Sequence, residues 1–206
     1  MNITYNYHLN DLPDDLDFYG DIAIDTEAMG LSNHRDRLCL VQLADEKGNI
    51  HIVHFKDRNF TAKNLKILLL NKQKLKIFHF ARFDLAVMHK YLNIQLENIY
   101  CTKIASKLCR TYSHHHSLSA LCLELLNIKL SKNQQTSDWG AKKLNEEQLQ
   151  YAAKDVLYLH KIKDKLAEKL ERESRTKLAE KCFNFLPYKA ELDLLGWLEN
   201  DIFSHQ

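Results

Sequence analysis

Few residues of this sequence belong to the types that mark linkers, disulfide frameworks or membrane segments. Only 2 Pro and 5 Gly occur among 206 residues, so no stretch has the composition of a flexible linker. The 5 Cys are odd in number, form no C-x-x-C pair and lack the density of a disulfide scaffold, which favours the reduced thiols of a cytoplasmic protein. No apolar run approaches the length of a membrane span, and the N-terminal segment lacks the basic and apolar regions of a secretory signal.

A large net charge of either sign is also absent. The 29 Lys and Arg nearly balance the 27 Asp and Glu, which leaves +2. Such a chain has no overall basic field to hold a long polyanion, although a short or locally bound nucleic acid remains compatible with it. Hydrophobic residues make up 45% of the chain, which is enough for a core, and we expect one continuous domain over residues 1–206.

The order of predicted elements indicates an α/β fold. Short stretches rich in β-branched residues predict strands, and the turn-prone segment "DEKGN" joins two of them as a hairpin. The strands are expected at 20–25, 37–44, 49–55, 75–80 and 98–102, with helices at 61–71, at 82–92 and from Asn145 onward as one long helix. Asn145 and Gln148 form a capping-box pattern at the start of that helix. We therefore expect a mixed five-stranded sheet flanked by helices.

Two carboxylates stand at the end of the first predicted strand, in "DIAIDTEAMGL". Asp25 and Glu27 project to the same face because side chains alternate along a strand. Buried, unpaired carboxylates are costly, so the pair needs an explanation. One explanation is that Asp25 simply ends the strand and that Glu27 already lies in a solvated turn.

Two further acids occupy positions that suit a site. Asp84 stands near the start of a helix that directly follows a strand, where the crevice of an open α/β sheet opens. Asp155 lies four residues after Tyr151, on the apolar stripe of the long helix. Taken alone, Asp84 is also explained as a favourable partner of the helix dipole, and Asp155 as a buried acid that is hydrogen-bonded to Tyr151.

Together the four acids predict a site for divalent cations. Hard cations such as Mg²⁺ and Mn²⁺ take oxygen ligands, and they would offset the repulsion among clustered carboxylates. Two such ions can activate a water and stabilise a leaving oxygen in phosphoryl transfer. The predicted metal ligands are all carboxylates, and none is His or Cys, which argues against structural zinc.

The motifs "DTEAMGL", "FHFARFD" and "YAAKD" resemble those of the DEDD exonucleases, the DnaQ-like members of the ribonuclease H-like fold, and Tyr151 matches their Tyr subtype. The segments "HRDRLCLVQLA" and "LSKNQQTSDW" resemble ribonuclease D, and the whole chain resembles the short nanoRNase C family of alphaproteobacteria. The resemblance implies a 3′→5′ exoribonuclease that uses Mg²⁺ or Mn²⁺ and releases nucleoside 5′-monophosphates from short RNA, diribonucleotides above all.

The resemblance also implies roles for single residues. Asp25, Glu27 and Asp155 would hold the metal on the nucleophile side, Asp25 and Asp84 would hold the second metal, and Tyr151 would position the water. One position departs from the pattern, because ribonuclease D-like enzymes usually have Asn where this chain has Phe80.

Substrate contacts are predicted at positions that core packing or an ordinary loop would explain equally well. The candidates are Leu31, His79, Phe83, Lys132, Gln135 and Trp139. Lys103, Lys107 and Arg110 form either a ridge that faces phosphate or a solvated face, of which the solvated face is favoured. The run "SHHHS" predicts a polar loop in which Ser117 caps the next helix.

The apolar C-terminal tail, about residues 183–206, predicts a helix that packs on this domain or on another copy. The family resemblance favours a homo-oligomer, with an octamer as one candidate. Few residues follow the long helix, so additional nucleic-acid-binding domains are not expected, which favours short RNA as the substrate. Two alternatives remain open: an enzyme that trims longer RNA 3′ ends or DNA, and a catalytically silent nucleic-acid-binding module.

Overall fold

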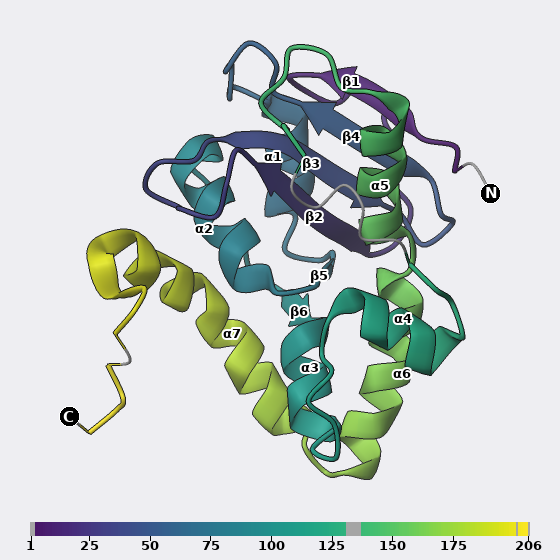
Figure 1. The fold of residues 1–206 in the computed structure, drawn as a ribbon, viewed down its shortest axis with the longest axis vertical. Coiled ribbons are helices and arrows are strands. Elements are labelled where there is room, and N and C mark those ends of the chain that lie inside the picture. Colours follow the sequence, from purple (N-terminus) through teal and green to yellow (C-terminus); the bar gives the residue numbers. More distant parts are fainter. Residues whose placement is uncertain (1–2, 131–136, 201, 206) are drawn as a thin grey trace.

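A six-stranded mixed sheet lies at the centre of the protein, in the order β1-β4-β3-β2-β5-β6 (Figure 1). The computed structural model describes residues 3–130, 137–200 and 202–205. The strands are β1 (Asn6–Leu9), β2 (Ile22–Ala28), β3 (Leu38–Ala44), β4 (Ile50–His54), β5 (Lys76–Phe78) and β6 (Ile99–Cys101). Strand β3 runs antiparallel to both β2 and β4, whereas β1, β5 and β6 pair in parallel with their neighbours.

The predicted α/β class and the five predicted strands are confirmed, but the predicted strand number is wrong by one. The additional strand is β1, which lies at the edge of the sheet and pairs with β4. Its sequence, Asn-Tyr-His-Leu, is only four residues long and mostly exposed. Tyr7 and Leu9 alternate with polar residues, but two apolar side chains are too few to distinguish a strand from a loop, and both remain exposed in the structure.

Helices cover both faces of this sheet. The helices of the described chain are α1 (Lys63–Leu70), α2 (Ala81–Leu92), α3 (Thr102–Cys109), α4 (Leu118–Leu126), α5 (Glu146–Leu157), α6 (Leu159–Arg172) and α7 (Thr176–Leu192), followed by the short π-helix η1 (Asp193–Trp197). Figure 1 shows α5 lying across one face of the sheet, over β2, β3 and β4, and α1 behind the opposite face. The buried apolar residues of both layers form one continuous core.

The predicted long helix from Asn145 is in fact two helices. Its start is confirmed, because the Asn145 side chain accepts from the Gln148 backbone N–H and the Gln148 side chain accepts from that of Asn145. Helix α5 ends at Leu157, and a turn at Tyr158 redirects the chain into α6. This turn lets α5 lie on the sheet while α6 packs against α3. A period of apolar residues alone cannot reveal it, because the buried stripe continues on both sides of the turn.

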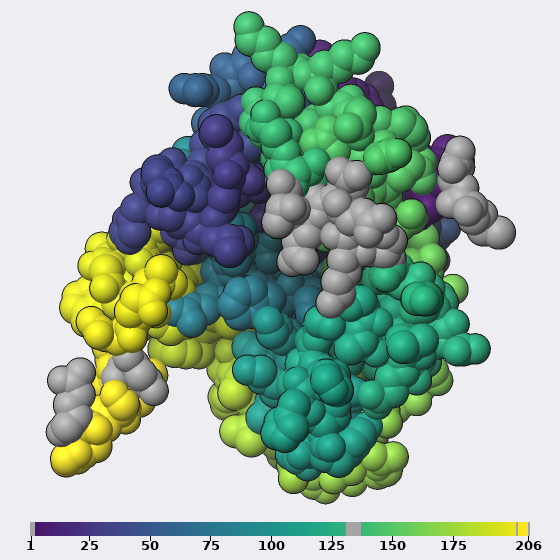
Figure 2. All heavy atoms as spheres, in the orientation of Figure 1, coloured from purple at the N-terminus to yellow at the C-terminus, as the bar shows by residue number. Residues whose placement is uncertain are grey.

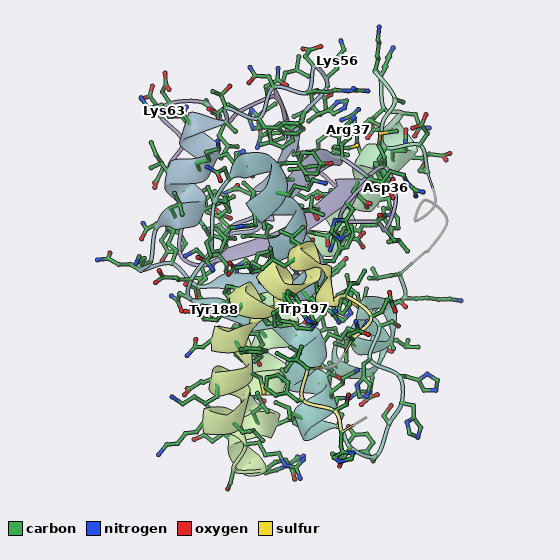
Figure 3. The ribbon with its side chains drawn as sticks, turned by 90° about the vertical axis from the view of Figure 1, so that its left-hand side faces the viewer. Asp36, Arg37, Lys56, Lys63, Tyr188 and Trp197 are labelled. Atoms are coloured by element: carbon green, nitrogen blue, oxygen red, sulfur yellow. The ribbon has the colours of Figure 1, made fainter. Side chains whose placement is uncertain are left out.

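The C-terminal tail is tied to the body through a buried acid. Asp193 is 1% exposed and pairs with Arg82 of α2 and, at 2.8 Å, with Lys189 of α7. Arg82 also donates to the Leu198 carbonyl at 2.9 Å. Figure 3 labels Tyr188 and Trp197, which lie on this C-terminal segment and are both exposed. In the part of the chain that the structure describes, no helix has the length and apolar character to cross a membrane.

Candidate active site

Strand β2 presents Asp25 and Glu27 on one face of the sheet. Both carboxylates are only partly exposed. The register between β2 and β3 shifts directly after Glu27, where Cys39 is the additional residue on β3. Irregularities of this kind locally redirect a strand, and here the shift ends the regular pairing at the second acid.

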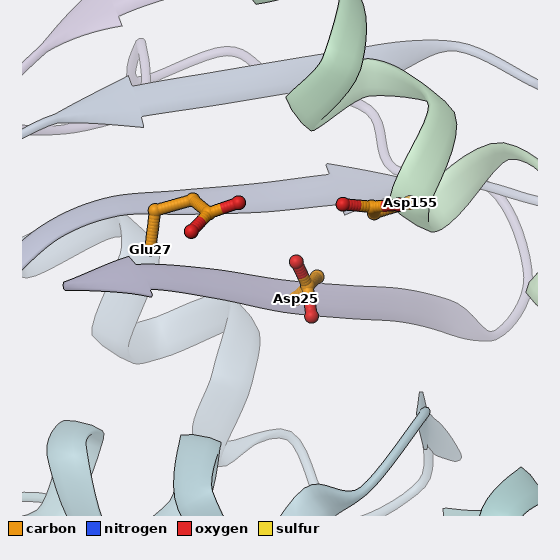
Figure 4. Close-up of side chains that lie close together, drawn as sticks. All are labelled: Asp25, Glu27 and Asp155. Carbon is orange, nitrogen blue, oxygen red and sulfur yellow. The ribbon is translucent and has the colours of Figure 1, made fainter. Parts of the chain in front are cut away.

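Helix α5 brings the third acid to the same place. Asp25, Glu27 and Asp155 each offer a carboxylate oxygen, and these oxygens lie within 4.8 Å of one another. Figure 4 shows Asp155 descending from its helix toward Asp25 and Glu27 on the strand below. Residues 25 and 155 are far apart in the sequence, and the packing of α5 across β2 brings them together in space.

Asp84 reaches the site from the opposite face of the sheet. Thr26 alternates with the two acids of β2, and its hydroxyl donates to Asp84 Oδ1 at 2.6 Å. Asp84 is buried in the first turn of α2, and the Asp25 charge raises its pKa in addition to burial. It therefore lies near Asp25, although it is not part of the three-acid cluster. Thr26 was not singled out in the sequence, because its partner becomes evident only when α2 is placed.

Burial and mutual repulsion disturb the protonation of all four acids. Burial raises the pKa of Asp25 to about 7. It also raises the pKa of Glu27 well above the ordinary value, with further increases from the charges of Asp25, Asp155 and Asp84. The pKa of Asp155 is raised by burial and then by Asp25. The cluster thus disfavours its own full ionisation.

These acids offer what a divalent cation requires. Within the described ranges, no Lys, Arg or His forms an ion pair with any of the four carboxylates. The donor set consists of oxygen atoms, which Mg²⁺ and Mn²⁺ prefer. A positive ion would supply the charge that the surrounding side chains do not.

Tyr151 stands one helical turn before Asp155 and is hydrogen-bonded to it. Burial, followed by the nearby carboxylates, raises the pKa of Tyr151 far above its ordinary value, so the phenol stays protonated and donates. Trp139 lies behind this ring, with the centroids of the two rings 6.1 Å apart. Trp139 is 2% exposed, so in this structure it supports Tyr151 and does not offer a free face to a ligand.

The loop after β2 holds Leu31 out in solvent. This side chain is 86% exposed, whereas hydrogen bonds hold the neighbouring residues of the loop in place. The Asp36 carboxylate accepts from the Ser32 backbone N–H at 3.0 Å and lies so close to Gly30 that a Cβ there would come within 2.3 Å of it. Lys90 of α2 donates to the Asn33 carbonyl at 3.0 Å. Figure 2 shows the loop, in dark blue, beside a hollow in the surface.

His79 and Phe83, two further predicted substrate contacts, are partly buried. The His79 ring is 2.9 Å from the Thr102 hydroxyl, and burial lowers its pKa to about 3, so it is neutral and joins β5 to α3. Phe83 packs against the core. Phe80 is 44% exposed and has a left-handed backbone (φ 72°), and Lys103 lies 4.1 Å from its ring centre. Asn adopts this conformation with less strain than Phe, which is a physical reason for the Asn that the family resemblance leads one to expect at this position.

The remaining predicted residues do not join the acid cluster among the described residues. Lys132 and Gln135 fall outside the part of the chain that the structure describes. Arg110 is fully buried, so both a phosphate ridge and a solvated face are wrong for it. Its guanidinium pairs with Glu124 and donates to the His115 carbonyl at 2.9 Å, which fastens the His-rich loop. Ser117 caps α4 as predicted.

Comparisons with known proteins agree on one family. A family model described as "3'-5' exonuclease" matches residues 1–171. A solved structure of Brucella melitensis NrnC bound to pGG is 49% identical, with a TM-score of 0.95 over 99% of this chain and 100% of that one. The same protein with bound Mg²⁺ is 48% identical, with a TM-score of 0.94 and the same coverage.

Longer relatives share a part of their length with this chain. Ribonuclease D of Bartonella henselae is 29% identical over 155 residues, which are 75% of this chain and 38% of that protein. The chain thus spans less than half the length of the curated ribonuclease D relatives that it matches.

Proposed function

Because this chain belongs to the family of 3′–5′ exonucleases, which hydrolyse phosphodiester bonds, we propose that it is a metal-dependent exoribonuclease of short RNA. It removes residues from the 3′ end as nucleoside 5′-monophosphates, and diribonucleotides are the substrates that we favour. The observation that supports this most is similarity over nearly the whole chain to a protein bound to pGG, combined with a cluster of Asp25, Glu27 and Asp155.

Mg²⁺ or Mn²⁺ fits the site as cofactor. Asp25, Glu27 and Asp155 would hold one ion, and Asp25 with Asp84 the second. Bound ions of this kind activate a water and stabilise the leaving oxygen. The oxygen-only donor set and the raised pKa values of the acids support this assignment, as does the Mg²⁺ bound to the Brucella protein.

The chain's own side chains orient the reactants. The Tyr151 phenol stays protonated. In the loaded site, where Asp155 would hold a metal ion, the Tyr151 O–H turns from Asp155 to the attacking water and orients that water as a hydrogen-bond donor. Leu31, exposed on its fastened loop, contacts a terminal base, with Phe83 beside it. His79 helps to position the substrate through its hydrogen bond with the Thr102 hydroxyl. Contacts of Lys132 and Gln135 with phosphate remain part of the proposal.

Replacement of single acids tests the activity. Asp25→Asn and Asp155→Asn each remove a metal ligand and should abolish metal-dependent release of mononucleotides from a diribonucleotide. Asp164→Asn, on the exposed face of α6, is the matched control and should retain full turnover. Retained turnover in either site variant would contradict the assignment, and intact far-ultraviolet dichroism excludes unfolding as the cause of a loss.

Enzymes that trim longer RNA ends or DNA are the main alternative, because the curated ribonuclease D relatives share the domain. A series of RNA and DNA strands of increasing length separates the two. Turnover that falls steeply beyond dinucleotides supports our proposal, whereas equal rates on long RNA would overturn the diribonuclease assignment. Binding of short RNA without any release of mononucleotide would indicate a silent module.

We also propose one domain over residues 1–206 whose C-terminal tail, about 183–206, serves a homo-oligomer, with an octamer as one candidate. Apolar side chains of this tail remain exposed, among them Leu195, Trp197 and Ile202. Such surface is costly in water and suits contact with another copy. Free cysteines support a cytoplasmic location.

A further inference from the structure

Gln42, at the centre of β3, is the polar residue that the hydrophobic core does not explain. It is completely buried, and neither its Oε1 nor its Nε2 has a hydrogen-bond partner among the described residues. The other residues of β3, Leu-Cys-Leu-Val before it and Leu-Ala after it, are apolar. An unpaired buried amide is costly, and an apolar side chain of the same size would avoid that cost.

The sheet places this amide beside the acids. Gln42 is paired directly with Asp25 across the antiparallel strands β2 and β3. Residues that face each other in this way point to the same side of the sheet and approach closely. That side is covered by α5, which brings Asp155, and Figure 4 shows β3 running beside β2 beneath that helix. The unpaired amide therefore lies next to the carboxylate that both proposed metal positions share.

We infer that Gln42 is a positioning residue for the metal-loaded site, an inference that rests on the proposed function. In the loaded protein its Nε2–H donates to the carboxylate of Asp25 and fixes the direction in which that carboxylate presents its oxygens. A neutral amide suits this task because, unlike Lys or Arg, it brings no positive charge to compete with a cation. Outer partners of this kind orient metal ligands, and their removal weakens metal binding by roughly 10- to 100-fold.

The free protein and the loaded protein should respond to substitution in opposite directions. Gln42→Met keeps the unbranched shape and removes both polar atoms. In EDTA it should raise Tm by roughly 2–8 °C, because two unpaired polar atoms leave the core. With Mn²⁺ alone as the probe, calorimetry should give a Kd weakened by roughly 10- to 100-fold. The Mn²⁺-induced rise in Tm should shrink accordingly.

Leu43→Met is the matched control, because it repacks a buried residue of the same strand on the opposite face of the sheet. It should shift Tm equally with and without Mn²⁺ and leave the Kd for Mn²⁺ unchanged. An unchanged Kd in Gln42→Met overturns the inference. So does a lower Tm in EDTA, since it would mean that the amide is already paired in the metal-free protein.

The wild-type titration separates this inference from the proposed function. If wild-type protein binds Mn²⁺ and hydrolyses diribonucleotides but Gln42→Met binds equally well, only the role of Gln42 fails. If wild-type protein neither binds Mn²⁺ nor hydrolyses RNA, the proposed function fails and Gln42 has no loaded site to position.

Discussion

The acids of the site make the metal-free protein sensitive to pH. Burial raises the pKa of Asp25 to about 7, and the pKa values of the other three site acids are also raised. Because the folded carboxylates hold protons more tightly than the unfolded ones, the free energy of unfolding falls as pH rises through the folded values. Buried histidines of β4 oppose this trend only below the pKa of an unfolded His, about 6.5.

Between that pH and about pH 8, to which burial lowers the pKa of Lys76, the carboxylates decide the slope. In EDTA, the Tm of the wild-type protein should fall between about pH 6.5 and about pH 8, and Asp25→Asn should show a smaller fall because one titrating charge is gone. Saturating Mn²⁺ should remove most of the decline in the wild-type protein. Differential scanning calorimetry measures all three, and equal slopes in the wild type and the variant would contradict the raised pKa of Asp25.

Tyr151 offers a second prediction for a single residue. Tyr151→Phe removes the hydroxyl and keeps the ring that packs near Trp139. Loss of a donor that orients the attacking water should lower kcat by roughly 100-fold and change KM little. Steady-state kinetics on a diribonucleotide test this. A variant with the kcat of the wild type would assign the phenol a purely structural role.

Single residues also show what the sequence could and could not reveal. Asp25, Glu27, Asp84, Asp155 and Tyr151 could be named in advance because each stands in a recognisable motif. Thr26 and Gln42 could not be named, because their significance depends on which side chain lies opposite. Arg110 looked like a surface residue because its helix position said nothing of Glu124, which approaches from the next helix.

Among the elements, the loop between β2 and β3 has the clearest consequence for specificity. Leu31→Ala should lower kcat/KM for a diribonucleotide by roughly 10-fold, because the apolar contact that we propose between Leu31 and a base would be lost. A nitrophenyl ester of ribose 5-phosphate carries no base, so its hydrolysis should be unaffected. Parallel kinetics on the two substrates measure the difference, and an equal loss on both would mean that Leu31 supports the site in general.

Most elements were predictable because their periods are clear. The hairpin β3–β4 and the cap of α5 follow from local pattern and turn chemistry. Strand β1 was missed because it is only four residues long and mostly exposed, and because its pairing with β4 is not visible in a sequence window. The break at Tyr158 was missed because it is set by where α6 must pack, and a sequence window does not include that information.

At the scale of the whole molecule, the tail determines assembly in our proposal. Trp197→Ser combined with Leu198→Ser should lower the mass of the wild-type assembly in solution, because exposed apolar surface is lost. Ile67→Ser replaces an exposed apolar residue on α1, and this matched control should leave the mass unchanged. Multi-angle light scattering gives the masses. A monomeric wild-type protein would rule out the oligomer.

The central claim is that acids from β2, α2 and α5 meet to share divalent cations. Anomalous diffraction from crystals of the protein soaked with Mn²⁺ and an uncleaved dinucleotide tests it most directly. We predict two manganese peaks, one held by Asp25, Glu27 and Asp155 and the other by Asp25 and Asp84. Peaks elsewhere on the surface, or none at these four carboxylates, would contradict the account.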